Sequence, residues 1–224
     1  RDIYRSLLAE KKQFVYLTNV DNLGSTIDPV SLAILALSGK QAGFDFSFKT
    51  PYDTKGGILV ENDKGRLTCA DIGAAVSREQ VREQEEAGKT LLFNCATGLF
   101  DLPFLCSHLD EIINNLPLRI SEQHKDAGNY SQTEQITWEV LGLLDDFLVF
   151  AVEKSMRFLP SKVLIENFMA SGIGLEESSK INGTLDSESG AYIKNLHAGL
   201  RRALLQEYGL AEAEGVWLPA DSGL

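Results

Sequence analysis

Apolar residues in the first fifty positions switch between the spacing of helices and the spacing of strands. Helical spacing runs through 1–12, and a compact apolar run of strand length follows at 14–18. Asp28 followed by proline predicts the start of a helix that continues through 30–37, because aspartate caps helices and proline fits their first turn. Phenylalanines at every second position of 43–49 predict a half-buried strand.

The same alternation continues through the middle of the chain. A β-hairpin is predicted with strands at 58–61 and 66–70, since polar turn residues and a glycine separate them. The pattern further predicts a helix at 77–86, a strand at 90–94, and helices at 102–116 and 132–153. Strands that alternate with helices, together with a hairpin, indicate an α/β sandwich with a mixed sheet.

The end of the chain has a different character. Residues 176–190 are rich in Ser, Glu and Gly, which is typical of a linker. An amphipathic stripe across 191–208 then predicts a helix. We therefore expect a main α/β domain at 1–175, a linker at 176–190 and a helical appendage at 191–224.

Composition and charge narrow the function classes. The chain has 224 residues, with 21 Lys and Arg against 32 Asp and Glu, and its net charge of -11 disfavours nucleic-acid binding. It contains no run of eighteen apolar residues, so no transmembrane helix is expected. Its three cysteines form no CxxC pair, which favours a reducing compartment. We expect a cytoplasmic protein. The chain begins with Arg rather than Met, so we expect a longer protein. A plastid location therefore stays open, because any transit peptide would lie upstream.

Polar residues directly after the first predicted strand form a candidate metal and substrate site. Asn19, Asp21 and Asn22 follow the apolar run, and ligands of α/β sheets bind at the carboxyl ends of strands. A carboxylate at such a place suits Mg²⁺, which binds one or two protein oxygens and completes its shell with phosphate and water. The residues alone also fit an Asx turn that leads into the next helix.

Two lysine-containing segments are candidates for phosphate binding. Lys49 and Lys55 flank a turn, and Gly56 and Gly57 follow, where a backbone without side chains can approach a ligand. The second segment ends at Lys162 and combines basic, apolar and proline residues. Lysine ammonium groups bind phosphates well, but both segments also fit solvated surface turns.

The order of these motifs resembles the UDP-glucose pyrophosphorylase (UTP–glucose-1-phosphate uridylyltransferase) family. The similarity runs from about residue 10 to residue 170. The motifs that carry it are, in order, Asn19-x-Asp-Asn-Leu-Gly24, Asp28, Lys49-Thr-x-x-Asp-x-Lys-Gly-Gly57, Asn94, Gln132-x-Glu134 and Arg157-Phe-Leu-Pro-x-Lys162. The resemblance implies a GT-A-like nucleotidyltransferase with a mixed sheet flanked by helices. Its reaction forms UDP-glucose and pyrophosphate from UTP and glucose 1-phosphate.

The resemblance also implies roles for single residues. Asp21 matches the metal-binding aspartate of the family, and Mg²⁺ is the expected cofactor. Lys55 and Lys162 match lysines that hold the sugar phosphate and the triphosphate. Residues expected to contact substrate are Asn19, Asn22, Lys49, Gly56, Gly57, Asp71, Asn94 and Glu134.

Several positions depart from the family pattern. The segment from Asn94 to Gly98 keeps only the first residue of the family's Asn-Thr-Asn-Asn, and Asp71 stands where the family has Glu. The Gly-rich loop that binds uridine and triphosphate has no counterpart, so the chain resembles the second half of the catalytic domain. We expect the N-terminal nucleotide-binding half to be a missing partner. Two alternatives stay open: a nucleotide-sugar binding module without chemistry, and a uridylyltransferase for another sugar such as N-acetylhexosamine 1-phosphate.

Overall fold

The computed structural model describes residues 1–125, 128–161, 187–214 and 216–220. These residues form two compact units. The first unit comprises 1–17 and 28–151, and the second comprises 18–27 together with the described residues from 152 onward. The expected division at 175–190 falls mostly on residues outside the described ranges, so it stays a prediction.

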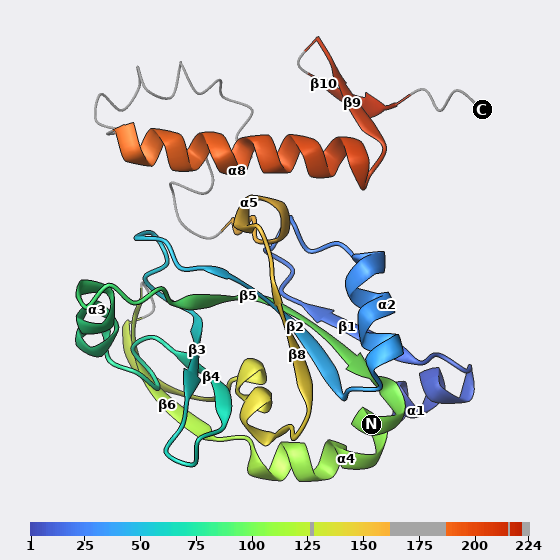
Figure 1. The fold of residues 1–224 in the computed structure, drawn as a ribbon, viewed down its shortest axis with the longest axis vertical. Coiled ribbons are helices and arrows are strands. Elements are labelled where there is room, and N and C mark those ends of the chain that lie inside the picture. The colour runs from blue at the N-terminus through green and yellow to red at the C-terminus, as the bar shows by residue number, and fades with distance from the viewer. Residues whose placement is uncertain (126–127, 162–186, 215, 221–224) are drawn as a thin grey trace. The chain divides into compact units, whose positions relative to one another are not determined.

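The first unit is built on a mixed six-stranded sheet (Figure 1). Its strand order is β4-β3-β5-β2-β8, and β1 pairs with β5 beside this path. β2 is parallel to β8 and antiparallel to β5, and β3 and β4 form the predicted hairpin. The strands are β1 (Phe14–Thr18), β2 (Ala42–Phe48), β3 (Gly57–Glu61), β4 (Leu67–Asp71), β5 (Leu92–Asp101) and β8 (Phe147–Ala151). The expected α/β class with a mixed sheet is confirmed.

Helices and a two-stranded ribbon surround this sheet. The helices are α1 (Asp2–Ala9), α2 (Pro29–Ser38), α3 (Arg78–Glu86), α4 (Leu102–Asn115) and the short 3-10 helix η1 (Thr137–Leu143). The ribbon consists of β6 (Leu118–Lys125) and β7 (Gly128–Gln135), which pair only with each other among the described strands.

The start of α2 follows the capping rules. The Asp28 carboxylate accepts hydrogen bonds of 3.1 Å from the backbone N–H groups of Val30 and Ser31. The helix ends at Gly39, whose φ of 67° is the left-handed conformation that glycine adopts without strain. The predicted helix is therefore confirmed from its cap to its last turn.

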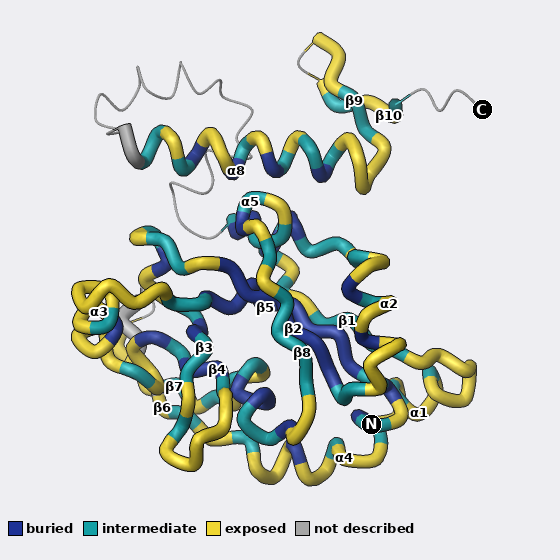
Figure 2. Tube along the Cα trace, in the orientation of Figure 1, coloured by how far each residue is buried: buried dark blue, intermediate teal, exposed yellow. Residues whose placement is uncertain are grey.

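The core lies between the sheet and the helices α4 and η1. Phe44 and Phe46 of β2 are fully buried (Figure 2). Leu141 is also fully buried, and Phe100 is 2% exposed. Phe44 and Phe100 meet edge to face, with ring centroids 5.3 Å apart, a favourable aromatic geometry. These rings fix the strands that carry the candidate site.

The prediction that β2 is half-buried is wrong. All of Ala42–Ser47 is buried, and only Phe48 at the end of the strand is exposed. β2 lies between β5 and β8, and a Cβ atom on Gly43 would lie 2.5 Å from the Phe150 ring, so the second face of the strand is covered too. A strand inside a sheet with both faces covered need not show polar residues on one side.

The predicted helix at 132–153 is also wrong. This stretch contains the end of β7, the 3-10 helix η1 and the strand β8. Residues 132–135 pair with β6, and Phe147–Ala151 pairs with β2 in parallel register. The apolar residues of these short elements reproduce helical spacing by coincidence. Strand pairing instead satisfies the backbone hydrogen-bonding groups at both ends of the stretch.

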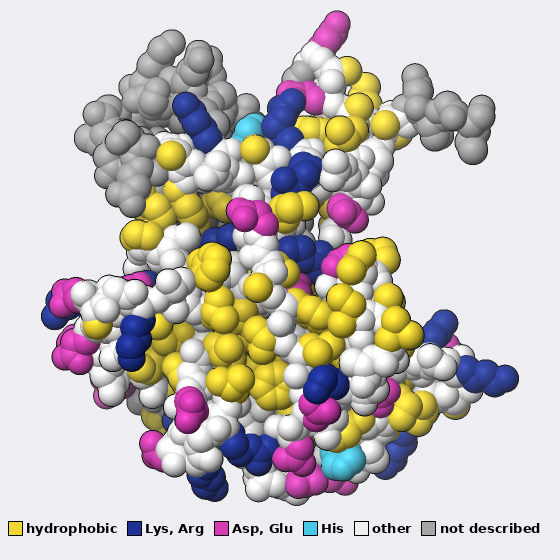
Figure 3. Space-filling view, viewed as in Figure 1, with side chains coloured by type: hydrophobic (Ala, Val, Ile, Leu, Met, Phe, Trp, Pro, Cys, Tyr) yellow, Lys and Arg dark blue, Asp and Glu magenta, His cyan; other side chains and the backbone are white. Residues whose placement is uncertain are grey.

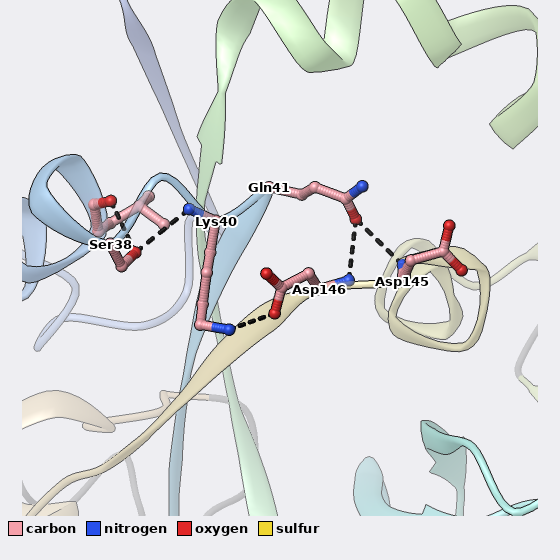
Figure 4. A network of polar contacts seen from close by, with 6 residues as sticks. Ser38, Lys40, Gln41, Asp145 and Asp146 are labelled. Carbon is pink, nitrogen blue, oxygen red and sulfur yellow. Dashed lines mark hydrogen bonds and ion pairs between the residues drawn. The ribbon is translucent and has the colours of Figure 1, made fainter.

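A polar network ties the start of β2 to the start of β8 (Figure 4). The Gln41 side-chain oxygen accepts hydrogen bonds from the backbone N–H groups of Asp145 and Asp146, at 3.0 and 3.1 Å. Lys40 forms an ion pair with Asp146, and the Lys40 N–H donates to Ser38 Oγ at 3.2 Å. The parallel register of the two strands is thereby set at their first residues.

The surface of the first unit carries apolar side chains around β8 and α2. Hydrophobic side chains gather over β2 and β8 in the view of Figure 3. On α2, Val30, Ile34 and Leu37 share one helix face and are 65%, 45% and 89% exposed. None of the described helices has the length and apolar character needed to cross a membrane.

The second unit packs a loop and a short helix against a long helix. Leu23 and Leu159 lie against Tyr192, Leu196 and Leu200 in its small core. Its elements are α5 (Lys154–Arg157), α8 (Ser187–Gln206), β9 (Leu210–Ala213) and β10 (Val216–Pro219). The helix expected at 191–208 is confirmed, although a β-hairpin follows it within the stretch expected to be helical.

Candidate functional site

The turn before β3 is held together by its own polar side chains. Asp53 is buried, and its Oδ2 accepts hydrogen bonds from the Thr50 backbone N–H at 2.6 Å and from its hydroxyl at 2.8 Å. Lys49 donates to Glu85 of α3 at 2.7 Å, and the Lys49 side chain is only 7% exposed. Lys55, by contrast, is exposed at the tip of the same turn. Of the two lysines, Lys55 is therefore the more accessible from solvent.

Gly56 and Gly57 lie where the backbone approaches other groups closely. Gly56 has a φ of 119°, and a Cβ on it would lie 2.7 Å from the Phe93 ring. A Cβ on Gly57 would lie 2.2 Å from Cys69 Sγ, 3.4 Å from Asp71 Oδ1 and 3.6 Å from Asn94 Cβ. Glycine is required at both positions for steric reasons.

Three predicted substrate residues therefore converge at one point of the sheet. Gly57 is paired with Asp71 across the β3–β4 ladder, and Asn94 reaches the same spot from β5. The sequence separates these residues by up to 37 positions, and the sheet brings Asp71 and Asn94 within 3.6 Å of the place that a Cβ on Gly57 would take. They form the centre of the candidate site.

Both the nitrogen and the oxygen of the Asn94 amide bind groups of its own chain. Its Nδ2 donates to Cys69 Sγ at 3.4 Å, and its Oδ1 accepts from the Ala96 backbone N–H at 2.9 Å. Ala96 has a φ of 53°, the left-handed region that a non-glycine residue adopts only at a cost. The pairing of β2 with β5 shifts register opposite this residue, so a β-bulge interrupts the strand beside the site.

Cys69 is a site residue that the sequence did not single out. Burial raises the pKa of its thiol from 9.0 to about 12, which the Asn94 hydrogen bond opposes and the charges of Asp71 and Glu139 reinforce. The thiol therefore stays protonated at neutral pH and acts as a packing group. Its neighbours in three dimensions identify it, and no sequence motif does.

Glu134 lies on the β6–β7 ribbon, directly across the ladder from Arg119. Its carboxylate accepts a hydrogen bond of 3.3 Å from Gln132 of the same strand. Arg119 itself binds the buried carboxylate of Glu139 on η1 through three contacts of 2.8 to 3.2 Å. Sequence analysis missed both Arg119 and Glu139.

A cavity of about 710 Å³ opens beside this ion pair. It is bounded by the turn between β3 and β4, by β4, α4 and η1, and Arg119, Glu139 and Cys69 lie in its wall. None of the predicted site residues that the structure describes lines it. Its charged lining residues include both signs, so its electrostatics favour no single ligand charge.

In the second unit, Asn22 holds the loop that carries Asp21. Asn22 is buried, its Nδ2 donates to the Arg157 carbonyl at 3.0 Å, and its Oδ1 accepts from the Gly24 and Leu159 N–H groups at 3.1 and 2.9 Å. The Asx turn considered from the sequence is thus present at Asn22. A backbone turn over residues 19–22 precedes it, in which the Asn19 carbonyl accepts a hydrogen bond from the Asn22 N–H at 3.1 Å.

The structure describes the predicted metal ligand Asp21 but not the predicted phosphate ligand Lys162. Lys162 lies outside the described residues, although Ser161 before it donates its N–H to the Asp21 carbonyl at 3.1 Å. Asp21 is partly buried. Among the described residues, no three His, Cys, Asp or Glu side chains gather as a metal site. A Mg²⁺ held here would have the Asp21 carboxylate as a ligand, and Mg²⁺ that also binds phosphates commonly takes only one or two protein carboxylates.

Comparison with known proteins identifies the relatives of this chain. A family model described as UTP–glucose-1-phosphate uridylyltransferase matches residues 1–178. The chain is 27% identical to the UTP–glucose-1-phosphate uridylyltransferase of Solanum tuberosum over 157 residues, and 28% identical to that of Encephalitozoon cuniculi over 180 residues. These alignments cover 70% and 80% of this chain, but only 32% and 35% of the relatives. The chain therefore spans about a third of their length.

Solved structures agree on the fold. A UDP-glucose phosphorylase from Trypanosoma brucei superposes with a TM-score of 0.64 at 22% identity. A point mutant of the UDP-glucose pyrophosphorylase of Leishmania major, in complex with UDP-glucose, superposes with a TM-score of 0.58 at 20% identity. Each comparison covers 73% of this chain and 38% of the solved one.

Proposed function

Because the chain belongs to the UTP–glucose-1-phosphate uridylyltransferase family, we propose that it forms the sugar-binding part of an enzyme that makes UDP-glucose. The observation that carries the proposal is the convergence of Gly57, Asp71 and Asn94 from three strands. Asp71 and Asn94 supply a carboxylate and an amide, which suit a polyhydroxylated ring that donates and accepts hydrogen bonds. The absence of a side chain at Gly57 makes room for Cys69 Sγ, so glycine there lets the strands pack around this point.

The proposed reaction needs alignment and charge neutralisation more than covalent catalysis. A phosphate oxygen of glucose 1-phosphate attacks the α-phosphorus of UTP, the bond from that phosphorus to the bridging oxygen breaks, and pyrophosphate leaves. Lys55, exposed at its turn, would bind the sugar phosphate, and Lys162 is proposed to bind the triphosphate. Mg²⁺, bound through Asp21, would neutralise charge on the phosphates.

We propose that the uridine and triphosphate sites lie in a further part of the enzyme. In support, the chain covers only 38% of the solved relatives. The intact mass of the purified protein tests this, because a mass well above 24.6 kDa is expected if the further part is joined to the chain.

One observation weakens the case for catalysis by these residues and keeps open a binding module without chemistry. Both polar groups of the Asn94 amide bind the chain itself, and Lys49 is paired with Glu85. A site whose polar groups are already satisfied gives a ligand fewer new hydrogen bonds. Binding of UDP-glucose without release of pyrophosphate, measured on the chain together with its further part, would identify this function.

The experiment that decides between these functions is a binding and turnover assay with a matched lysine control. UDP-glucose binding is measured by calorimetry, and pyrophosphate release is measured with UTP and a panel of sugar 1-phosphates that includes N-acetylglucosamine 1-phosphate. Lys55→Ala should weaken sugar-phosphate binding at least about tenfold, whereas Lys89→Ala, which removes an exposed lysine from another turn, should not change it. Equal effects of the two variants, or no binding by the wild type, would refute the proposal.

A further inference from the structure

The loop that carries Asp21, residues 19–26, lies against a segment that follows it far along the chain. This segment is 157–161, and both belong to the second unit. The Ser161 N–H donates to the Asp21 carbonyl at 3.1 Å, and the Leu23 N–H donates to the Leu159 carbonyl at 3.0 Å. The segment therefore holds the backbone of the Asp21 loop directly, on both sides of Asn22.

The middle of the loop packs closely on the same segment. A Cβ on Gly24 would lie 3.0 Å from the carbonyl carbon of Arg157 and 3.1 Å from Leu159 Cγ, so a larger residue would push the loop away. The Asn22 side chain binds the Arg157 carbonyl and the Leu159 N–H at 3.0 and 2.9 Å. The loop is thus fixed from Asp21 to Gly24.

The far end of the loop is held by a side chain of this segment. Arg157 Nη1 donates a hydrogen bond of 3.1 Å to the Thr26 hydroxyl, and both side chains are partly buried. Hydrogen bonds from a charged donor contribute more to stability than neutral ones. Arg157 therefore fixes the loop at two points, through its carbonyl in the middle and through its guanidinium at the end.

A guanidinium in a segment with a predicted phosphate ligand could also bind a phosphate. The structure favours a role inside the protein, because Arg157 Nη1 is directed to the loop and not to a surface position. The two roles make different predictions for Thr26. Loss of the Thr26 hydroxyl should reproduce the loss of the guanidinium if Arg157 acts through the loop, and should have no effect if it binds a ligand itself.

We propose that Arg157 is a positioning residue that closes the Asp21 loop through Thr26 and so holds Asp21 in place for the metal ion. The metal-binding role of Asp21 rests on the proposed function, whereas the closing of the loop does not. Mg²⁺ requires nearly ideal octahedral geometry, so a carboxylate on a loop that opens would bind it less well.

Hydrogen exchange of the loop amides, measured by NMR, tests the closing of the loop without a ligand. The backbone N–H groups of residues 22–26 are all hydrogen-bonded, so their exchange reports opening. Arg157→Met and Thr26→Val should each accelerate it about fivefold, and the double variant no more than either one. The matched control is Thr18→Val, since the Thr18 hydroxyl bonds only the neighbouring Asn19 carbonyl, at 3.4 Å, and it should leave this exchange unchanged.

Three results of this experiment would overturn the closing of the loop by Arg157. The first is unchanged exchange in either single variant. The second is acceleration in the double variant equal to the product of the two single effects, because the side chains would then act independently. The third is equal acceleration of the amides of α8, because Arg157 would then stabilise the whole second unit and not the loop.

Mn²⁺ alone then tests the positioning of Asp21. Mn²⁺ accepts the same oxygen ligands as Mg²⁺, and its paramagnetic broadening of the loop signals detects even weak binding. Asp21→Asn should abolish binding, Arg157→Met and Thr26→Val should each weaken it about threefold, and Arg157→Lys, which keeps a donor, should weaken it less. Weakening by Arg157→Met without weakening by Thr26→Val would overturn the positioning role. Without Mn²⁺ binding by the wild type, the metal site of the proposed function fails and the positioning role with it, while hydrogen exchange still decides whether Arg157 closes the loop.

Discussion

Replacing Gly57 by alanine should destabilise the first unit because the new methyl group meets Cys69. The added Cβ would lie 2.2 Å from Cys69 Sγ, a distance at which one of the two groups has to move. Overpacking of this kind costs about 1–3 kcal/mol in a well-packed core. Cys69 belongs to the main core and cannot shift without breaking its hydrogen bond to Asn94.

The compensating variant makes this prediction quantitative. Cys69→Ala alone removes one buried sulfur and should cost about 1 kcal/mol. In the double variant, the methyl group introduced by Gly57→Ala occupies the space that the sulfur leaves, so the two changes together should cost about as much as Cys69→Ala alone. The expected interaction energy between the two positions is thus about 1–3 kcal/mol.

The measurement is urea unfolding of the four proteins, followed by tryptophan fluorescence and circular dichroism. Gly190→Ala is the control, since no atom lies within 4 Å of a Cβ at that helical position. It should leave stability unchanged or raise it by up to about 1 kcal/mol. Strictly additive losses at Gly57 and Cys69, or a Gly57→Ala variant as stable as the wild type, would refute the steric argument.

Three further predictions concern the same site and its surroundings. The pKa of the Cys69 thiol is raised from 9.0 to about 12 on folding, so its contribution to stability is fully present below pH 9 and is lost as pH rises towards 12. The stability difference between wild type and Cys69→Ala, measured by urea unfolding, should therefore fall by about 1.4 kcal/mol per pH unit above pH 9, and a constant difference would contradict this. Ala96→Gly should raise the urea midpoint by an amount worth up to about 1 kcal/mol, because glycine relieves the left-handed conformation; a lower midpoint would show that no strain is stored there. Asn22→Ala should cost about 3 kcal/mol by thermal unfolding, since it leaves buried backbone groups unpaired. Asn22→Asp keeps two acceptor bonds and should cost less, and equal losses would argue against this account.

The parts of the fold that the sequence predicted correctly are governed by local chemistry. Asp28 announces the start of α2, because a side-chain cap depends only on the next few backbone N–H groups. The hairpin of β3 and β4 is equally local, since the Asn62 side chain and Gly65 build the turn within four residues. Such signals do not depend on the rest of the molecule.

The errors occur where distant partners determine the structure. Residues 147–151 form a strand because they pair with β2, and the local sequence pattern carries no information about that distant partner. β6 and β7 are largely polar, since the ribbon lies outside the main core, and alternation of apolar residues could not reveal them.

The candidate site shows the same division. Motif order indicated Gly57, Asp71 and Asn94, and the sheet brings these residues together. What the order could not show is that Cys69 lies among them, or that Arg119 binds Glu139, because these contacts depend on strand register and on the packing of η1.

The parallel pairing of β2 with β8 has a consequence for biosynthesis. Ala42 pairs with Phe147, so more than a hundred residues are synthesised between the two partners, and a pairing at such sequence distance forms slowly. Until β8 emerges from the ribosome, one edge of the apolar strand β2 stays unpaired and can associate with other chains. The tie between Gln41 and residues 145–146 comes directly before β8 in the order of synthesis, so it can align the last strand as it arrives. Expression yield should therefore depend on how fast residues 145–151 are translated and pair with β2.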